Sequence, residues 1–307
     1  MARKKSSINE LTQISKGWNA LFVVILFLVA LLVIIPMLLV IVISFSSEMS
    51  IADKGYSFFP NEWTLEGYQY LLKTGDQLWA SYKITIIHST LGTLISLSVM
   101  SLYAYVIAQK SFRYKNHFTW FLFFTMLFGG GLVPSYILNV RYLRIDDSLW
   151  IFLLPGMVNA YYTIILRTFI NTTIPDSLFE AARIDGAGHF RVFTTIVMPL
   201  YKAGIATVGL FNMVSRWNNW FTGMLYIRNP DLVPLQTLLT KLQNNIDFLK
   251  ANAEIANTPD GMALLRALPD ENMRMASTIA VILPILFAYP FFQRYFVQGL
   301  TVGSVKG

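Results

Sequence analysis

The sequence predicts an all-α membrane protein with six transmembrane helices, and three observations support this fold class. Of the 307 residues, 55% are hydrophobic and 13% are charged, against roughly 25% charged residues in soluble domains. The apolar residues gather in six long segments that carry almost no charge. The basic residues lie at the flanks of these segments, so the net charge of +7 indicates membrane topology and not nucleic-acid binding.

The first expected span follows a basic N-terminal segment, residues 1–19. Residues 20–43 carry no charge and are numerous enough to cross a bilayer. A signal peptide also begins with basic residues, but this apolar run is too long and ends without a small-x-small cleavage site. We therefore expect the helix to be retained, with Pro36 as a tolerated kink.

Five further spans are expected at about residues 84–108, 118–140, 148–167, 202–227 and 275–295. The transmembrane domain would then cover residues 20–297 and be followed by a tail at 298–307. Loop 109–117 contains three basic residues and no acid, whereas loop 44–83 contains five acids and three lysines. The positive-inside rule therefore places both termini, loop 109–117 and the 171–202 loop in the cytoplasm.

The longest outer segment, residues 228–274, contains apolar residues at helical spacings of three and four. They predict an amphipathic helix and are Leu235, Leu238, Leu239, Leu242, Ile246 and Leu249. Pro259-Asp260-Gly261 is expected to turn the chain back. The helix could lie on the outer membrane face or form a docking surface for an external partner, and the sequence leaves both open.

The segment between spans four and five predicts two helices joined by a glycine turn. Ser177, followed three residues later by Glu180, is typical of a capping box and predicts a helix start. Gly186 is expected to end that helix in the left-handed conformation. A second short helix is expected at residues 188–197, where Pro199 stops it or opens the next span.

This segment is predicted to bind another protein. Ala181 and Ala182 would keep one helix face thin enough to enter a groove, and Leu178, Phe179 and Ile184 would supply apolar area. Charged side chains at the rim would set the register. The family resemblance described below implies that the residues in contact with the partner are Ser177, Leu178, Phe179, Glu180, Ala181, Ala182, Arg183, Asp185, Gly186 and Ala187.

The fifth span contains the most informative polar residues. Asn212, Arg216 and Asn219 recur at intervals of four and three, so one helix face is expected to hold all three. A charged residue inside a span costs about 2.5–3.5 kcal/mol and usually faces a cavity or a partner. Two nearby tryptophans indicate either an interfacial belt or flat surfaces against which a sugar stacks. The candidate substrate path is Asn212, Ser215, Arg216, Asn219 and Trp220, with Asn159 and Tyr162 from the fourth span.

The sequence lacks the residues that several kinds of transport and catalysis require. Carboxylates are almost absent from the spans, which excludes proton coupling of the usual carboxylate type. The chain has no Gly-Lys dipeptide and hence no P-loop, so ATP for uphill transport would bind another polypeptide. It has no cysteine, and no histidines at metal-ligand spacing, so neither a metal site nor catalytic residues are predicted. Glycines 129–131 predict a bend or close helix packing in the third span.

Glu180-Ala181-Ala182, Gly186 and Ile196-x-x-Pro199 together resemble the cytoplasmic EAA loop of ABC importer permeases. Four further stretches resemble the carbohydrate-uptake branch of that family, which contains the maltose permeases, in a subgroup associated with oligosaccharides. These stretches are residues 128–134, 216–220, 233–236 and 295–307. One departure is that Tyr201-Lys202-Ala203 lacks the proline that many members place after Leu200.

The resemblance implies a permease subunit of an ABC importer in the bacterial plasma membrane, whose EAA loop is a coupling helix. The implied partners are a second permease subunit, two copies of a cytoplasmic ABC ATPase that binds ATP and Mg, and an extracellular solute-binding protein. No cofactor is expected in this chain. The alternatives are an ABC importer for a non-sugar solute, and an ATP-independent channel or secondary transporter.

Overall fold

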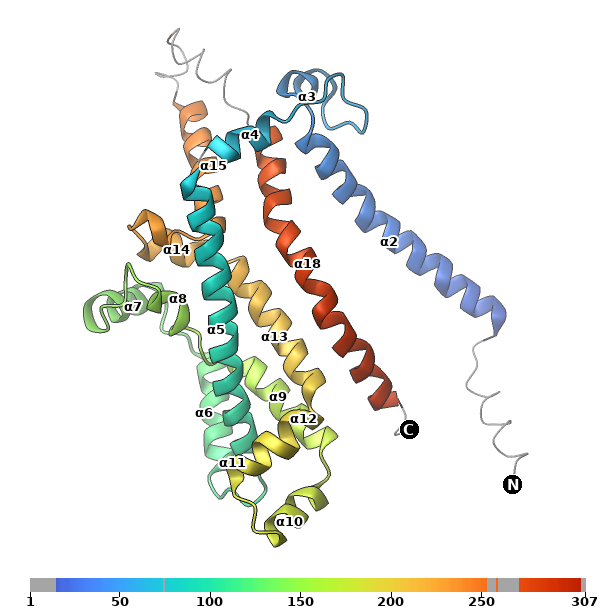
Figure 1. The fold of residues 1–307 in the computed structure, drawn as a ribbon, viewed down its shortest axis with the longest axis vertical. Coiled ribbons are helices and arrows are strands. Elements are labelled where there is room, and N and C mark those ends of the chain that lie inside the picture. Colours follow the sequence, from blue (N-terminus) through green and yellow to red (C-terminus); the bar gives the residue numbers. More distant parts are fainter. Residues whose placement is uncertain (1–14, 74, 253–257, 259–270, 305–307) are drawn as a thin grey trace. The chain divides into compact units, whose positions relative to one another are not determined.

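The computed structural model describes residues 15–73, 75–252, 258 and 271–304. The described residues form helices joined by loops, with one isolated antiparallel bridge between Ser46 and Trp63 (Figure 1). The chain divides into two compact units, residues 1–71 with 266–279 and residues 72–265 with 280–307. The helical fold class predicted from the apolar segments is confirmed.

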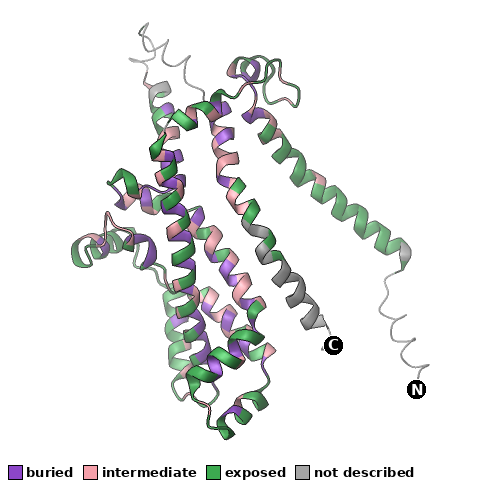
Figure 2. Ribbon diagram, viewed as in Figure 1, coloured by how far each residue is buried: buried purple, intermediate pink, exposed green. Residues whose placement is uncertain are grey.

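The first unit contains α2 (Lys16–Ser44), α3 (Glu48–Lys54), most of α4 (Glu66–Lys73) and the beginning of α18 (Glu271–Ser304). The helix α2 covers the expected first span, continues through Pro36 and is exposed along almost its whole length (Figure 2). An apolar helix that buries no face within its own unit needs lipid or other apolar surface around it.

Hydrogen bonds connect the loop segments of the first unit. The Tyr56 hydroxyl donates to Glu271 at 2.6 Å, and the backbone N–H of Asn272 donates to Glu48 at 2.8 Å. The start of α18 is thereby joined to the residues around α3. These contacts involve polar side chains that hydropathy alone does not pair.

The helix α5 (Asp76–Ala108) forms the centre of the second unit and begins at Asp76 rather than at residue 84. It packs against α9 (Ala160–Thr173), α13 (Lys202–Trp217) and α15 (Leu235–Ala251). Its buried positions include the small residues Ser81, Ser89, Gly92, Ser96, Ser101 and Ala104. Small residues allow helix backbones to approach closely, as is usual between membrane helices.

The third expected span is not one helix. The helix α6 (Lys115–Leu127) ends before residues 128–131, and α7 (Leu132–Ile137) with the π-helical turn η1 (Leu138–Tyr142) follows at an angle of 110°. Gly131 has φ +85°, and no heavy atom lies within 4 Å of a Cβ placed at Gly129 or Gly130. The glycines therefore serve a bend and not close packing, which confirms the first of the two alternatives predicted for residues 129–131.

The fourth and fifth expected spans are also interrupted. A short helix α8 (Trp150–Leu153) is separated from α9 by a loop containing Pro155 and Gly156, which has φ +72°. The helix α13 ends at Trp217, and α14 (Phe221–Tyr226) follows after a three-residue break. Residues 148–167 and 202–227 are therefore not single helices, because turn residues interrupt apolar runs that hydropathy reads as uniform. Their assignment as membrane spans stays a prediction.

The amphipathic helix predicted in the outer segment is confirmed as α15. Its residues Leu235, Leu238, Leu239 and Ile246 are buried, and the helix packs against α5 and α14. The backbone N–H of Leu235 donates to the Thr85 hydroxyl at 2.8 Å, which joins the start of α15 to α5. The turn expected at residues 259–261 lies outside the described residues.

Among the described residues, two helices are long and apolar enough to cross a membrane, Gly17–Ser44 and Asp76–Ala108. The number rises to four if each of two bent pairs is one span. One pair is α6 with α7 and η1, and the other is His189–Leu200 with α13, bent by 81°. The helix α18 is helical throughout the sixth expected span, 275–295.

Candidate functional site

The segment that resembles the EAA loop forms two helical stretches joined by a glycine turn. The first is α10 (Asp176–Ile184), and the second runs through α11 (His189–Val192), the π-helical turn η2 (Phe193–Val197) and α12 (Met198–Leu200). Gly186 has φ +71° and donates its N–H to the carbonyl of Arg183 at 3.0 Å. The left-handed helix end predicted at Gly186 is confirmed.

Two details of this segment were predicted wrongly. The helix α10 begins at Asp176, preceded by Pro175 and without a side-chain cap, so Ser177 lies inside the first turn and forms no capping box. The second helical stretch continues past residue 197 to Leu200. Pro199 lies one residue before the end of this stretch, so its missing N–H affects only the last helical turn.

The outward face of α10 differs from the expected one. Ala182 is 6% exposed and belongs to a buried cluster with Val192, Phe193 and Tyr201, and Phe179 packs against the same cluster. Successive residues of a helix point about 100° apart, so Ala181 is exposed while Ala182 is buried. The prediction of a thin face made by both alanines was therefore wrong for Ala182.

We call the exposed surface of α10 and its turn the coupling face. It comprises Leu178, Ala181, Ile184 and Asp185, and the Ile184 side chain is 87% exposed. Ser177, Glu180, Arg183 and Gly186 are also exposed, and Ala187 is half-buried. Glu180, Arg183 and Asp185 form no ion pair with other residues that the structure describes, so their charges remain available to a partner.

The coupling face rests on a core formed by other helices of the second unit. The Tyr105 hydroxyl of α5 lies 3.3 Å from Nδ1 of His189, and its ring packs 5.4 Å from Phe193. Met100 and Ala104 of α5, with Leu166 and Ile170 of α9, complete the buried cluster. A movement of α10 is therefore mechanically linked to α5 and α9.

Arg216 connects three helices of the second unit through its guanidinium. Nε donates to Asn212 at 2.9 Å, Nη1 to the carbonyl of Phe152 in α8 at 2.6 Å, and Nη2 to the hydroxyl of Ser96 in α5 at 2.7 Å. Gly92 leaves room for the guanidinium, since a Cβ at this residue would lie 2.5 Å from Nη1 of Arg216. The charge is thus surrounded by neutral oxygens and not paired with an acid among the described residues.

The other residues of the predicted substrate path do not gather around Arg216. Asn219 lies beyond the end of α13, where its side chain accepts from the N–H of Thr222 at 3.1 Å, so the face predicted to hold all three polar residues was wrong for it. Asn159 caps α9 by accepting from the N–H of Tyr162 at 3.1 Å, and Tyr162 packs half-buried against the cluster around Met100.

Of the predicted path, the structure brings together Asn212 and Arg216. Ser215 and Trp220 are exposed. A role for these residues in sugar binding stays a prediction, and the hydrogen bonds of Arg216 inside the chain favour a structural role for this side chain. Both Asn159 and Asn219 occupy places where an asparagine satisfies a helix start.

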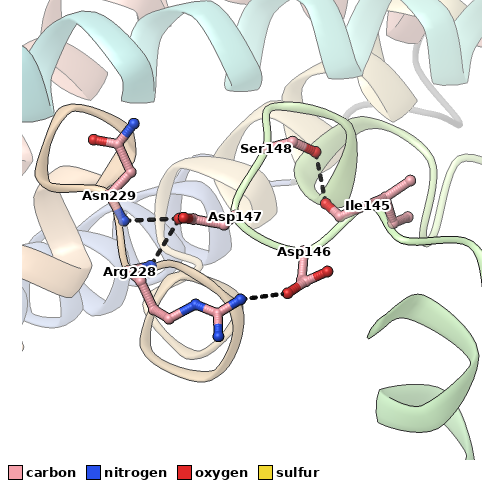
Figure 3. Close-up of polar contacts among 6 residues, drawn as sticks. All are labelled: Ile145, Asp146, Asp147, Ser148, Arg228 and Asn229. Carbon is pink, nitrogen blue, oxygen red and sulfur yellow. Dashed lines mark hydrogen bonds and ion pairs between the residues drawn. The ribbon is translucent and has the colours of Figure 1, made fainter. Parts of the chain in front are cut away.

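A second polar cluster joins two loops that were expected on the outer side, and the cluster itself was not predicted (Figure 3). The Asp147 carboxylate accepts from the backbone N–H groups of Asn229 at 2.7 Å and Arg228 at 2.8 Å, and Asp146 pairs with the Arg228 guanidinium at 2.6 Å. We call these four residues the outer clamp. Only the adjacency of two acids in a short loop hinted at it in the sequence.

The backbone of the outer clamp is strained. Asp147 has φ +50° and nearby Arg144 has φ +52°, a region that side chains other than glycine enter at a cost of about 1–3 kcal/mol. Hydrogen bonds from the backbone of Asn229 and then Arg228 hold the pKa of the Asp147 carboxyl below its usual value of 3.8. The ionised carboxylate is thus the form that stabilises this loop contact.

A metal centre is not suggested by the described part of the chain, which contains no group of three or more metal-binding side chains. Residues 112–302 match the model of a family described as "binding-protein-dependent transport system inner membrane component". The chain belongs to this family. It is accordingly a membrane transport component, multi-pass in the bacterial plasma membrane.

Relatives of this permease cover nearly its whole length. It is 32% identical over 282 residues to the polygalacturonan/rhamnogalacturonan transport system permease protein YtcP of Bacillus subtilis, covering 92% of this chain and 96% of that protein. It is 26% identical to the arabinooligosaccharides transport system permease protein AraQ of Halalkalibacterium halodurans, covering 91% and 93%.

A solved structure is similar to the permease in fold and in sequence. It is the crystal structure of a bacterial ABC transporter involved in the import of the acidic polysaccharide alginate. One of its chains matches with a TM-score of 0.75 and 30% identity, covering 92% of this chain and 99% of that one. The family resemblance that the EAA-like loop predicted is therefore confirmed.

Proposed function

We propose that this chain is a permease subunit of an ATP-driven importer that carries an oligosaccharide bearing uronate groups into the cell. The observation that carries the proposal is the coupling face, an exposed apolar and charged surface ended by Gly186 and supported by α5 and α9. Such a surface suits the groove of an ATPase, which would bind the ATP and Mg that this chain has no P-loop to hold. A second permease subunit would complete the pathway and cover the exposed helix α2.

The proposed topology has six spans, interrupted in the third to fifth, with both termini in the cytoplasm. Contacts within the second unit support it, since they join loops expected on the same side. Lys110 of an expected inner loop pairs with Asp176 of another. On the expected outer side the clamp joins residues 145–148 to residues 228–229 (Figure 3), and Gln77 donates to the carbonyl of Pro230 at 2.8 Å.

The surface expected to face outward also has the chemistry to bind an acidic substrate. An open cavity of about 630 Å³ is lined by Tyr136, Ile137, Val140, Arg141, Arg144 and Asp146. Arg141 and Arg144 are exposed and form no ion pair within the described part of the chain. Arginine binds carboxylates through two parallel N–H groups, and an aromatic ring packs against a sugar face. The similarity to YtcP and to the alginate importer agrees with this chemistry.

Uptake of sugars by cells that express the complete transporter tests the substrate class. Trigalacturonate is expected to be imported and neutral arabinotriose to be imported poorly. The double substitution Arg141→Gln and Arg144→Gln should reduce uptake of trigalacturonate, whereas Arg191→Gln, which removes a charge from α11, should not. Equal uptake of both sugars, unaffected by the double substitution, would contradict the uronate proposal and leave the family assignment intact.

Cysteine labelling tests the topology, because the chain has no cysteine of its own. Ser111→Cys in the expected inner loop should react with a membrane-impermeant maleimide only after the cells are opened. Asp53→Cys on α3 should react in intact cells. The reverse pattern would overturn the orientation.

A further inference from the structure

A cavity of about 540 Å³ lies behind the coupling helix α10. Its walls are the end of α5 with the following loop, the end of α9 and the inner side of α10. In the topology proposed above these are the cytoplasmic ends of membrane spans, which places the cavity at the level of the lipid headgroups. The cavity and the coupling face lie on different sides of α10. Glu180 and Arg183 line the cavity, whereas the four residues of the coupling face do not.

The side chains that line the cavity have a net positive charge. Four basic side chains line it, Lys110, Lys115, Arg167 and Arg183, against the two acids Asp176 and Glu180. Lys110 is already paired with Asp176 at 2.5 Å, and this hydrogen bond raises the pKa of the lysine above its usual range. Three cations then remain against one carboxylate.

Two buried donors in the cavity wall have no hydrogen-bond partner among the described residues. Gln109 is 7% exposed, and its Nε2 is one of them. Nε of Arg167 is the other. Buried N–H groups are nearly always paired, because an unpaired one forfeits its bonds with water. Both groups donate, so the missing partner is an acceptor, and the surrounding charge favours an anion.

We propose that this cavity binds a phosphate group, with Arg167 and Lys115 as its cations and Gln109 as a neutral donor. A phosphate has several acceptor oxygens that can bind these donors together. It can come from the headgroup of an anionic lipid or from free phosphate. Because Arg183 of α10 lines the same cavity, the bound anion holds the coupling helix against α5 and α9 and stabilises the conformation that the ATPase engages.

Hydrogen exchange of the full chain, purified within its transporter complex, tests the site. The complex is placed in nanodiscs of phosphatidylcholine alone or of equimolar phosphatidylcholine and phosphatidylglycerol. Phosphatidylglycerol should slow exchange at residues 107–111 and 176–186. Arg167→Gln should weaken the apparent affinity for it about tenfold, equivalent to ~1.4 kcal/mol.

The controls separate a specific site from general charge attraction. Lys115→Gln repeats the test if Arg167→Gln fails to fold. Arg113→Gln removes a charge from the same loop but not from the cavity wall, and it should retain the protection. Protection by inorganic phosphate in phosphatidylcholine discs, beyond that of chloride at equal ionic strength, identifies free phosphate as a sufficient ligand. Protection by phosphatidylglycerol alone identifies the lipid headgroup.

Three results would overturn the site. In the first, neither phosphatidylglycerol nor phosphate slows hydrogen exchange at these residues. In the second, both cavity variants are protected as well as the unchanged chain, and in the third, Arg113→Gln loses as much protection as the cavity variants. A cavity filled by a side chain of the ATPase gives the first of these. If the ligand is a lipid headgroup, it belongs to the cytoplasmic leaflet only in the orientation proposed above. Both leaflets of these discs have the same composition, so the test distinguishes a failed site from a failed orientation.

Discussion

The substitution Gly92→Ala is expected to destabilise the protein through Arg216. A Cβ at residue 92 would lie 2.5 Å from Nη1 and 2.8 Å from Cζ of the guanidinium. Atoms do not approach so closely, so the guanidinium must move. It cannot move freely, because it donates to Asn212, to the carbonyl of Phe152 and to Ser96. At least one of these hydrogen bonds must break.

The magnitude follows from two opposing effects. A hydrogen bond that involves a charged group contributes about 1.5–3 kcal/mol. Alanine in place of glycine inside a helix returns about 0.5–1 kcal/mol, because the unfolded chain is less flexible. The loss of one bond therefore lowers the free energy of unfolding by about 0.5–2.5 kcal/mol.

Unfolding of the full chain in detergent, followed by denaturant titration, measures this change. Gly17→Ala is the matched control, since Gly17 is also helical and no heavy atom lies within 4 Å of its added Cβ. In an Arg216→Ala background the clash is absent, and Gly92→Ala should be neutral or slightly stabilising. The same loss in both backgrounds would refute the reasoning.

Three further predictions concern the coupling segment and the outer clamp. At Gly186, with φ +71°, valine should impair transport more than asparagine at equal expression, and equal activities would contradict the left-handed turn. Ile184→Asp should lower co-purification of the ATPase without changing the stability of the chain, whereas Ala182→Trp should destabilise the chain itself because that residue is buried; thermal unfolding with ATPase pull-down separates the two. The lowered pKa of Asp147 means that its contribution to stability is present above the usual carboxyl pKa and is lost as the pH falls through the lowered one. With Asp147→Asn, thermal stability should therefore fall less as the pH is lowered. An unchanged pH profile would show that this carboxylate does not cause the loss of stability in acid.

The positions of apolar segments and of turn residues were predictable because they are local properties. The helix α15 followed from leucines at spacings of three and four, and the left-handed Gly186 followed from a glycine placed after a helical pattern. The bend at glycines 129–131 was one of two predicted alternatives, whereas the breaks in the fourth and fifth apolar runs were missed. Hydropathy averages over a window and ignores the Pro155-Gly156 turn. The EAA-like loop identified the family because many residues at defined spacing have to match together.

Neighbouring residues with the same chemistry could be distinguished only in the folded chain. Ala181 and Ala182 differ in the direction in which they leave α10, and the packing of Val192 and Phe193 decides which of them is buried. The partners of Arg216 were likewise out of reach, since Ser96 is 120 residues away in the sequence. In the sequence Arg216 resembles a residue that contacts a ligand. In the structure its guanidinium donates to three uncharged oxygens of the same chain.

The sequence by itself determined a helical membrane protein of the ABC permease family, because hydropathy, turn propensity and motif spacing depend on residues close together in the chain. The tertiary structure alone decided which face of α10 is exposed, how the outer clamp closes and where unpaired donors meet in one cavity. These features arise where distant segments pack together. Their geometry depends on the direction of side chains from separate helices, which no local pattern encodes.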